Sequence, residues 1–377
     1  MTFGSIFKSI FSIFAKAVFA LISFFVMLML FSLLFIGLGA GIGAKLGTDS
    51  LTKITEQTQS DYAFISGNEE SQNRLLKLSI QGVILGSMPA NFPPFLSDNL
   101  TFGYDLKDTL EQAATDESIK GVLLHVQSPG GTIFGSYAIA EAIAKFREAT
   151  NKPVLAYIEG LAASGGVMAM VTASEIYADY GSLIGSIGVI GPQLLYYNQP
   201  MAYDEGLFTS GIVTKGGIEQ TILFAGKGKD LGNPFRKITK EELENWQRGL
   251  ETEYDQFVRH VARTRNIDES IIRDQMGAQL FDNQTAEAYG LINGTLNQND
   301  SIAKLAELAG VDEDYQLVRP QRRGGQFWTQ LLEGYARLSG NAVEMEQVRQ
   351  QTIHAQVCQK TTHLSLVYYG DMAALCR

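Results

Sequence analysis

The chain has 377 residues, of which 45% are hydrophobic and 19% charged, and its formal net charge at pH 7 is −10. This length allows two or three folded units, and the hydrophobic content can fill a sizeable core, which excludes a disordered chain. The negative charge, without any block of Lys or Arg, argues against nucleic acid as a partner. The two cysteines, Cys358 and Cys376, are too few for a disulfide framework, although they allow one disulfide bond.

The N-terminal segment 1–45 contains a long stretch without charge. Residues 17–44 hold no charged side chain and are rich in Phe, Leu, Ile, Val and Met. About 20 apolar residues span a bilayer, so we interpret this stretch as a transmembrane helix; a cleaved signal peptide is the alternative, but its apolar region usually has about 7–15 residues. Lys8 and Lys16 precede the stretch and favour a cytoplasmic N-terminus. The rest of the chain would then lie on the opposite, periplasmic or extracytoplasmic, side of the inner membrane.

The segment that follows the apolar stretch is polar. Residues 46–73 are rich in Thr, Gln, Ser, Asp and Glu and show neither helical nor strand periodicity, so we predict a tether. Beyond the tether, the hydrophobic pattern predicts strands at 76–80, 121–126, 154–158 and 176–178, and helices at 106–114, 137–146 and 162–173. Strands that alternate with helices in this order predict an α/β body with largely parallel pairing.

The second half of the chain is predicted to be mainly helical. Thr239 and Glu242 form a capping box, which predicts a helix through about Arg265. The predicted body covers residues 74–314. Residues 315–377 then form a small C-terminal extension of unknown role, with a helix at 327–337 and a strand-like segment at 364–369.

Two glycine-rich turns follow buried strands, where an open α/β sheet places its ligands. They are Ser128-Pro-Gly-Gly131 and Ala163-Ser-Gly-Gly166. The second turn puts Ser164 at a strand-to-helix junction, beside the exposed N–H groups that an oxyanion requires. The N–H groups of Gly131 and Gly165 could point to the same place and form an oxyanion hole. Ordinary helix capping by serine remains open, whereas dinucleotide or phosphate binding is disfavoured because neither glycine-rich signature occurs.

A serine nucleophile needs a base, and the residues alone leave its identity open. His125 is the histidine nearest in sequence to the turns, but it sits in an apolar strand, where a hydrogen-bonded core histidine is the usual case. A lysine whose pKa is lowered by burial is the alternative. Lys227 and Lys229 lie in a glycine-flanked segment, and an ordinary solvated loop is the competing interpretation of that segment. The sequence contains no cluster of metal-ligating residues, so we predict neither a metal nor a cofactor.

Five motifs in order resemble those of the signal peptide peptidase A family. They are Gln127-Ser-Pro-Gly-Gly131, Ala163-Ser-Gly-Gly166, Gly185-Ser-Ile-Gly-Val-Ile190, Gly226-Lys-Gly-Lys-Asp230 and Asn233-Pro-Phe-Arg236. The resemblance covers about residues 75–310. It implies a membrane-bound serine peptidase with a crotonase-like or Clp-protease-like α/β fold and a Ser/Lys dyad. Ser164 would be the nucleophile, Lys229 the general base and Ser186 the group that holds the lysine, while Gly131 and Gly165 would supply the oxyanion donors.

The sequence departs from the family pattern at several places. Val167, Gln127 and the segment Leu291-Ile-Asn-Gly294 differ from the usual residues, but none of them removes a reacting group. Lys229 follows Ser164 by 65 residues, which is longer than expected, and the excess falls at about 196–220. Because that insertion contains Lys215, both Lys215 and Lys227 remain alternatives for the base.

The resemblance implies a membrane-anchored endopeptidase without a cofactor. Its substrates would be apolar peptides, such as remnant signal peptides or membrane-protein fragments, cleaved through an acyl-enzyme, and its other partner would be membrane lipid. The chain carries one set of motifs, and the resemblance implies that such chains complete the dyad between neighbouring subunits. We therefore expect a homo-oligomer, for which an octameric ring is one candidate. A crotonase-type coenzyme A thioester enzyme and a non-catalytic membrane scaffold remain alternatives, whereas the apolar N-terminus argues against a phage-capsid role.

Overall fold

The computed structural model describes residues 27, 29, 61–89, 99–192, 194, 196–197, 222–223, 225–321, 358 and 364–370. The chain divides into two compact units, Met1–Asp61 and Tyr62–Arg377. The predicted transmembrane helix lies outside the described residues, apart from Met27 and Met29, which are helical and exposed. Lys215 and the predicted helix at 327–337 also lie outside them. Among the helices that are described, none is both long and apolar enough to cross a membrane.

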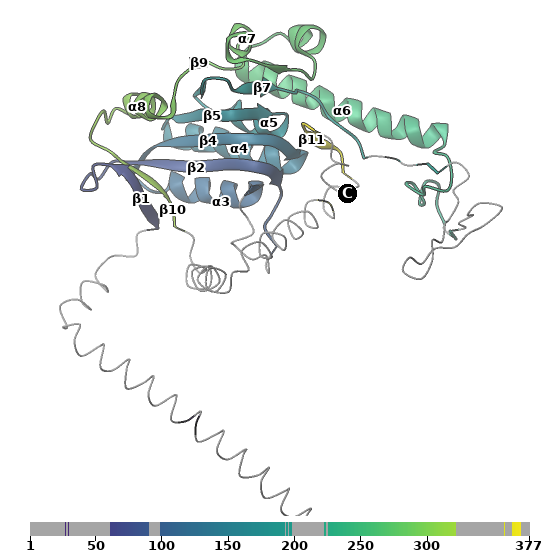
Figure 1. Ribbon diagram of the computed structural model, residues 1–377, viewed down its shortest axis with the longest axis horizontal. Coiled ribbons are helices and arrows are strands. Elements are labelled where there is room, and N and C mark those ends of the chain that lie inside the picture. Colours follow the sequence, from purple (N-terminus) through teal and green to yellow (C-terminus); the bar gives the residue numbers. More distant parts are fainter. Residues whose placement is uncertain are drawn as a thin grey trace, which may run out of the picture. The chain divides into compact units, whose positions relative to one another are not determined.

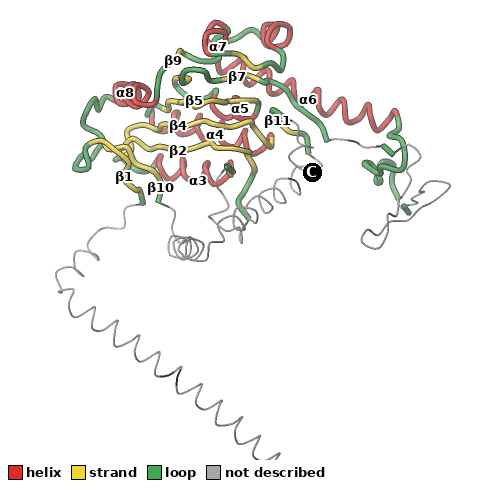
Figure 2. The backbone as a smooth tube through the Cα atoms, in the orientation of Figure 1, coloured by secondary structure: helices red, strands yellow, loops and turns green. Residues whose placement is uncertain are grey.

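The second unit is built on one mixed sheet of 11 strands (Figures 1 and 2). The strand order along its main path is β1-β10-β2-β4-β5-β6-β9. Along this path, the strands from β10 to β9 all pair in parallel with their neighbours. Three pairs are antiparallel: β1 with β10, β11 with β4, and β7 with β8. The strands are β1 (Tyr62–Gly67), β2 (Arg74–Leu85), β3 (Leu100–Phe102), β4 (Ile119–Thr132), β5 (Val154–Ala163), β6 (Glu175–Ala178), β7 (Leu183–Gly185), β8 (Leu280–Phe281), β9 (Gly294–Thr295), β10 (Gln316–Pro320) and β11 (Leu366–Tyr368).

Helices cover both faces of this sheet. They are α3 (Gly103–Ala114), α4 (Ile133–Thr150), α5 (Gly165–Met170), α6 (Lys240–Arg265), the π-helix η2 (Ile271–Met276), α7 (Asn283–Ala288) and α8 (Gln298–Ala309). Successive side chains of a strand point to opposite faces. Accordingly, Val122 and Leu124 of β4 join the larger core under α3, α4, α5 and α6, and Leu123 packs with Leu305 of α8 on the other face. Burial on both faces explains why β4 and β5 are nearly continuous apolar runs.

The structure confirms the predicted α/β class and its parallel pairing. The predicted strands and helices between residues 76 and 178 correspond to β2, α3, β4, α4, β5, α5 and β6. The capping box is also confirmed: Thr239 Oγ1 accepts from Glu242 N–H, and the Glu242 carboxylate accepts from Thr239 N–H. α6 ends at Asn266 in the left-handed conformation.

Two predicted boundaries differ from the structure. Residues 62–67 fall in the predicted tether but form β1, and residues 316–320 fall in the predicted extension but form β10. β1 is an edge strand whose last four residues are exposed, so it lacks the apolar alternation by which strands are predicted. It is fixed by antiparallel pairing with β10, which itself pairs with the start of β2. The sheet therefore extends beyond the predicted limits of 74–314 at both ends of the chain.

Candidate active site

Ser164 stands at the turn between β5 and α5 in a strained backbone conformation. Its φ is 53° and its ψ −110°, a region that L-residues with a side chain rarely adopt. The turn is held by two backbone hydrogen bonds, in which Ser164 N–H donates to Gly185 O at 2.8 Å and Met168 N–H donates to Ser164 O at 2.9 Å. A strained strand-to-helix turn of this kind is how α/β hydrolases present a nucleophilic serine. Ser164 makes no side-chain capping hydrogen bond to α5, so helix capping does not explain the residue.

The two glycine turns lie directly against each other. β4 and β5 pair in parallel with Ser128 opposite Ala162, so both turns leave the sheet at the same end. A Cβ placed on Gly165 would lie 3.0 Å from Gly131 N, and one placed on Gly130 would lie 2.6 Å from Gly165 N. Side chains are therefore excluded at Gly130 and Gly165, and the backbone nitrogen of Gly131 lies close to Gly165. Backbone donors in this arrangement are suited to an oxyanion.

Ser186 lies beside the Ser164 turn. β7 pairs with the end of β5, with Gly185 opposite Ala163, and Ser186 follows at once with a φ of 55°. Ser186 is 6% exposed, and its hydroxyl makes no hydrogen bond within the described part of the chain. The Ser164 hydroxyl donates a long hydrogen bond, 3.4 Å, to Gly188 O in the same segment. The structure thus brings together four of the five predicted site residues.

The fifth predicted residue, Lys229, lies on a separate loop that two of the motifs build together. Arg236 donates to both carboxylate oxygens of Asp230 at 2.6 and 2.7 Å and to both of Glu242 at 2.7 and 2.9 Å. These hydrogen bonds from the Arg236 guanidinium lower the pKa of Asp230 and lower the pKa of Glu242 to about 2. Because Glu242 also caps α6, the lysine loop is tied to the first turn of that helix.

The Lys229 side chain does not contact Ser164 in this chain. Lys229 is exposed and makes no side-chain hydrogen bond or ion pair among the described residues, and the described partner of the Ser164 hydroxyl is Gly188. No residue of α6 before Phe257 is buried. At about 1.5 Å per residue, roughly 25 Å of helix therefore precede the first buried position. Figure 1 shows segment 225–239 at the end of α6 that points away from the sheet.

The two described histidines hold structural positions. His125 Nε2 lies 2.6 Å from a carboxylate oxygen of Glu159, on the face of the sheet that α8 partly covers. His260 Nε2 lies 3.0 Å from Met168 O of α5. Burial lowers the pKa of both imidazoles. Neither contacts Ser164, which agrees with the prediction that His125 is a core histidine.

One feature of the site was not predicted from the sequence. The strand-like segment 364–369 was assigned no role, but its central residues form β11 and pair with Gly130–Thr132 of β4. The pattern of Leu366 and Val367 signals a strand, but nothing in that pattern indicates which element the strand joins.

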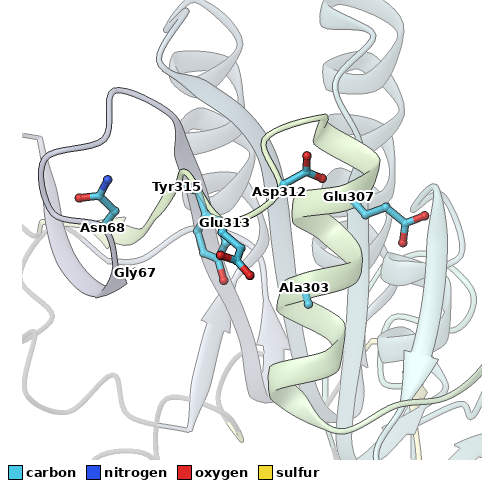
Figure 3. Close-up of a pocket in the computed structure, with 7 residues that line it drawn as sticks. All are labelled: Gly67, Asn68, Ala303, Glu307, Asp312, Glu313 and Tyr315. Atoms are coloured by element: carbon cyan, nitrogen blue, oxygen red, sulfur yellow. The ribbon is translucent and has the colours of Figure 1, made fainter.

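A hollow of about 360 Å³ lies at the other end of the sheet (Figure 3). It is lined by Gly67, Asn68, Ala303, Glu307, Asp312, Glu313 and Tyr315. Tyr315 immediately precedes β10, which pairs with the start of β2, whereas Ser164 follows the end of β5. The residues that line the hollow do not include a nucleophile together with a general base. In the part of the chain that the structure describes, no group of three or more His, Cys, Asp or Glu residues could hold a metal ion.

Comparison with known proteins identifies the family. The sequence signature of peptidase family S49 matches residues 146–312, which include Ser164, Ser186 and Lys229. A candidate signal peptide peptidase, SppA, of Enterococcus faecium is 31% identical over 254 residues, covering 67% of each chain. The chain belongs to peptidase family S49. The S49 match begins within α4 and ends after α8, so it includes the Ser164 turn, the Lys229 loop and helix α6.

Other similar proteins differ from this S49 chain in extent. A candidate protease of Methanocaldococcus jannaschii is 37% identical over 207 residues, which is 55% of this chain and 61% of that protein. Protease 4 of Haemophilus influenzae is 24% identical over 243 residues, 64% of this chain and 36% of that protein. This chain therefore matches less than two thirds of the length of either relative. Among solved structures, a membrane-bound stomatin-specific protease, 1510-N, is 14% identical, with a TM-score of 0.35 over 64% of this chain and 86% of that one.

Proposed function

We propose that this S49 peptidase is a membrane-anchored serine endopeptidase with a Clp-protease-like catalytic body, in which Ser164 is the nucleophile and Lys229 the general base. The observation that carries the proposal is the geometry of the serine turn. Ser164 has a strained backbone, and the glycine turns that contain Gly131 and Gly165 lie against each other. An acyl-transfer enzyme requires this combination of a presented nucleophile and donors fixed before charge develops.

The proposed mechanism has two stages. A neutral Lys229 amine removes the Ser164 proton as the oxygen attacks the scissile carbonyl, and the N–H groups of Gly131 and Gly165 stabilise the oxyanion. The intermediate expels the amine, which takes the proton from Lys229, and leaves an ester on Ser164. A water molecule then gives a proton to Lys229 and attacks the ester, and the released Ser164 oxygen takes that proton back from Lys229. Ser186 holds the lysine by a hydrogen bond to its hydroxyl.

The lysine comes from a neighbouring subunit in this proposal. Three observations support it: Lys229 is exposed and unpaired among the described residues, its loop is rigidly clamped by Arg236, and α6 carries that loop away from the body of its own chain. The Ser186 hydroxyl, which makes no hydrogen bond among the described residues, offers a docking point beside Ser164. A base that acts only when two chains meet requires a homo-oligomer, and we propose a repeated head-to-tail interface that closes into a ring such as an octamer.

Features near both ends of the chain support the proposed location of the catalytic body, and this location suggests its substrates. The uncharged stretch 17–44 is long enough for a bilayer anchor, and Lys8 and Lys16 favour a cytoplasmic N-terminus. Cys358 is disulfide-bonded, and such bonds persist in extracytoplasmic compartments. Both observations support a catalytic body outside the cytoplasm, close to the inner membrane. Apolar peptides such as remnant signal peptides or membrane-protein fragments leave the bilayer there.

The proposal is tested by hydrolysis of a fluorogenic apolar peptide with purified full-length protein in mild detergent. Ser164→Ala is expected to lower kcat by at least about 10⁴-fold, because the nucleophile is removed. Ser301→Ala is the matched control, since Ser301 is also fully buried, lies on α8 and has a hydroxyl without a hydrogen-bond partner. Turnover by Ser164→Ala at the rate of Ser301→Ala would refute the proposed nucleophile.

A further inference from the structure

β11 lies in a slot between two backbone segments that flank Ser164. On one side, Leu366, Val367 and Tyr368 pair antiparallel with Thr132, Gly131 and Gly130. On the other side, Leu366 and Ile190 exchange two backbone hydrogen bonds of 2.9 Å each. Tyr369 N–H donates to Pro129 O at 2.7 Å and extends the first pairing. Figure 1 shows β11 at the end of the sheet where β4 passes α5. This extended segment, sandwiched between backbones, has the form of a bound peptide.

The carbonyl of Val367 lies at the two glycine turns. A Cβ placed on Gly165 would lie 2.8 Å from Val367 O, and one placed on Gly130 would lie 2.1 Å from the same atom. Val367 is also the residue opposite Gly131 in the antiparallel register. Gly131 and Gly165 are the residues to which the proposed function assigns the oxyanion. The Val367 carbonyl oxygen therefore lies against the two turns that would hold the scissile carbonyl of a substrate.

Side-chain burial along the segment is uneven. Val367 is fully buried and belongs to the main core, and Leu366 is 4% exposed, whereas Leu364 and Tyr369 are 36% and 44% exposed. The two buried residues fill apolar sites of the body and the outer residues do not. The site beside the Val367 carbonyl thus accepts a branched aliphatic side chain.

We infer that residues 364–370 act as a built-in competitor for peptide substrates, and that the site filled by Val367 selects a branched aliphatic residue at the carbonyl that is attacked. This inference rests on the proposed function, because it assigns a substrate preference to the same site. Main-chain pairing with Gly130–Thr132 and Ile190 provides general peptide affinity, and the buried Val367 side chain provides selectivity. A substrate peptide must displace β11 before it reaches Ser164.

A disulfide-bonded residue lies close to this segment in the sequence. Cys358, six residues before Leu364, is disulfide-bonded. A covalent restraint lowers the conformational entropy that the segment loses on binding. The segment therefore competes at a high effective concentration, because it belongs to the same polypeptide as its site.

The test compares two aspartate variants of full-length protein. Val367→Asp places a charge in a fully buried apolar site, and Tyr369→Asp, the matched control, places the same charge at an exposed position of the same segment. Loss of one buried apolar side chain weakens such an association by roughly tenfold or more. We expect Val367→Asp to lower KM for a fluorogenic peptide with Val before the cleaved bond by about that factor, while Tyr369→Asp leaves KM unchanged. Equal KM values in the wild-type and Val367→Asp proteins would overturn the inference.

A binding experiment separates failure of this inference from failure of the proposed function. The labelled heptapeptide Leu-Ser-Leu-Val-Tyr-Tyr-Gly is titrated into the double variant Ser164→Ala, Val367→Asp, which needs no catalysis. Saturable binding that is lost when the Val of the peptide is replaced by Asp supports the inference even if no peptide is hydrolysed. An active enzyme whose variant does not bind the heptapeptide contradicts the inference and leaves the proposed function standing.

Discussion

At the scale of single residues, the site depends on glycines that leave room for a carbonyl. A Cβ added to Gly165 would lie 2.4 Å from Ser136 Oγ and 2.8 Å from Val367 O, which is too close for a methyl group. Gly165→Ala is therefore expected to lower kcat by about 10²-fold or more, because the methyl group displaces the oxyanion from its donors. Steady-state kinetics will measure the effect. Gly249→Ala on α6, where a Cβ meets open space, is expected to retain full activity; equal kinetics of the two variants would argue against an oxyanion hole at Gly165.

The buried histidines make stability depend on pH. Burial lowers the pKa of His260 and of His125 below the ordinary value of about 6.5, so the unfolded chain binds protons that the folded chain does not. Stability is then complete above about pH 6.5 and is lost as the pH falls from there towards the folded pKa values. We expect the melting temperature to decrease between pH 7 and pH 5. His260→Gln, which keeps a donor for Met168 O, should reduce that decrease; an unchanged slope would contradict the assignment.

The sequence predicted the serine turn and its donors because their positions depend on local order. β4 and β5 are consecutive parallel strands, so turns that follow them must emerge together, and Ser164, Gly131 and Gly165 are brought into one site. The lysine is different. Its loop is fixed by Arg236, but the place of that loop relative to a serine depends on packing between chains, which no motif encodes.

At the scale of elements, the lysine loop and α6 form one piece through Arg236. The hydrogen bonds from Arg236 lower the pKa values of Asp230 and Glu242, so both carboxylates stay ionised and the clamp persists at neutral pH; it is lost only as the pH falls below about 4 towards 2. Arg236→Ala is expected to lower kcat/KM by about 10²-fold, because Lys229 is no longer held in one geometry.

The control for Arg236→Ala is Arg248→Ala on the same helix. Arg248 is exposed and hydrogen-bonds to the neighbouring Asn245, so its removal should leave kcat/KM unchanged. Circular dichroism checks that α6 remains folded in both variants. An Arg236→Ala protein with wild-type kcat/KM would show that the clamp does not position the base.

The place of two short strands, β1 and β11, in the sheet was not predicted, for a physical reason. β1 is held by backbone pairing with β10 and not by an apolar face of its own, and the place of β11 depends on its pairing with the distant strand β4. Tyr62–Gly67 is mostly exposed, and β11 has three residues, so neither carries enough periodicity to reveal its place in the sheet. β4 and β5, in contrast, are buried on both faces and were evident from their apolar runs.

At the scale of the whole molecule, the proposed dyad is shared between subunits. Ser164→Ala removes the nucleophile and Lys229→Ala removes the base, so each homo-oligomer is expected to be inactive. When the two are dissociated, mixed in equal amounts and reassembled, a serine from one chain can meet a lysine from the other at about a quarter of the interfaces. Peptide hydrolysis should recover to about that fraction. No recovery from oligomers shown to be mixed would place the dyad within one chain or refute Lys229 as the base.

Covalent labelling tests the central claim, a nucleophilic serine at position 164, most directly. Full-length protein is treated with a fluorophosphonate probe and digested, and the modified residue is located by mass spectrometry. We expect one adduct on Ser164, formed about tenfold faster in Val367→Asp, where β11 no longer blocks the serine. Absence of an adduct on Ser164 in Val367→Asp would refute Ser164 as the nucleophile. The same conclusion would follow if Ser164→Ala still hydrolysed peptides and carried an adduct on another residue.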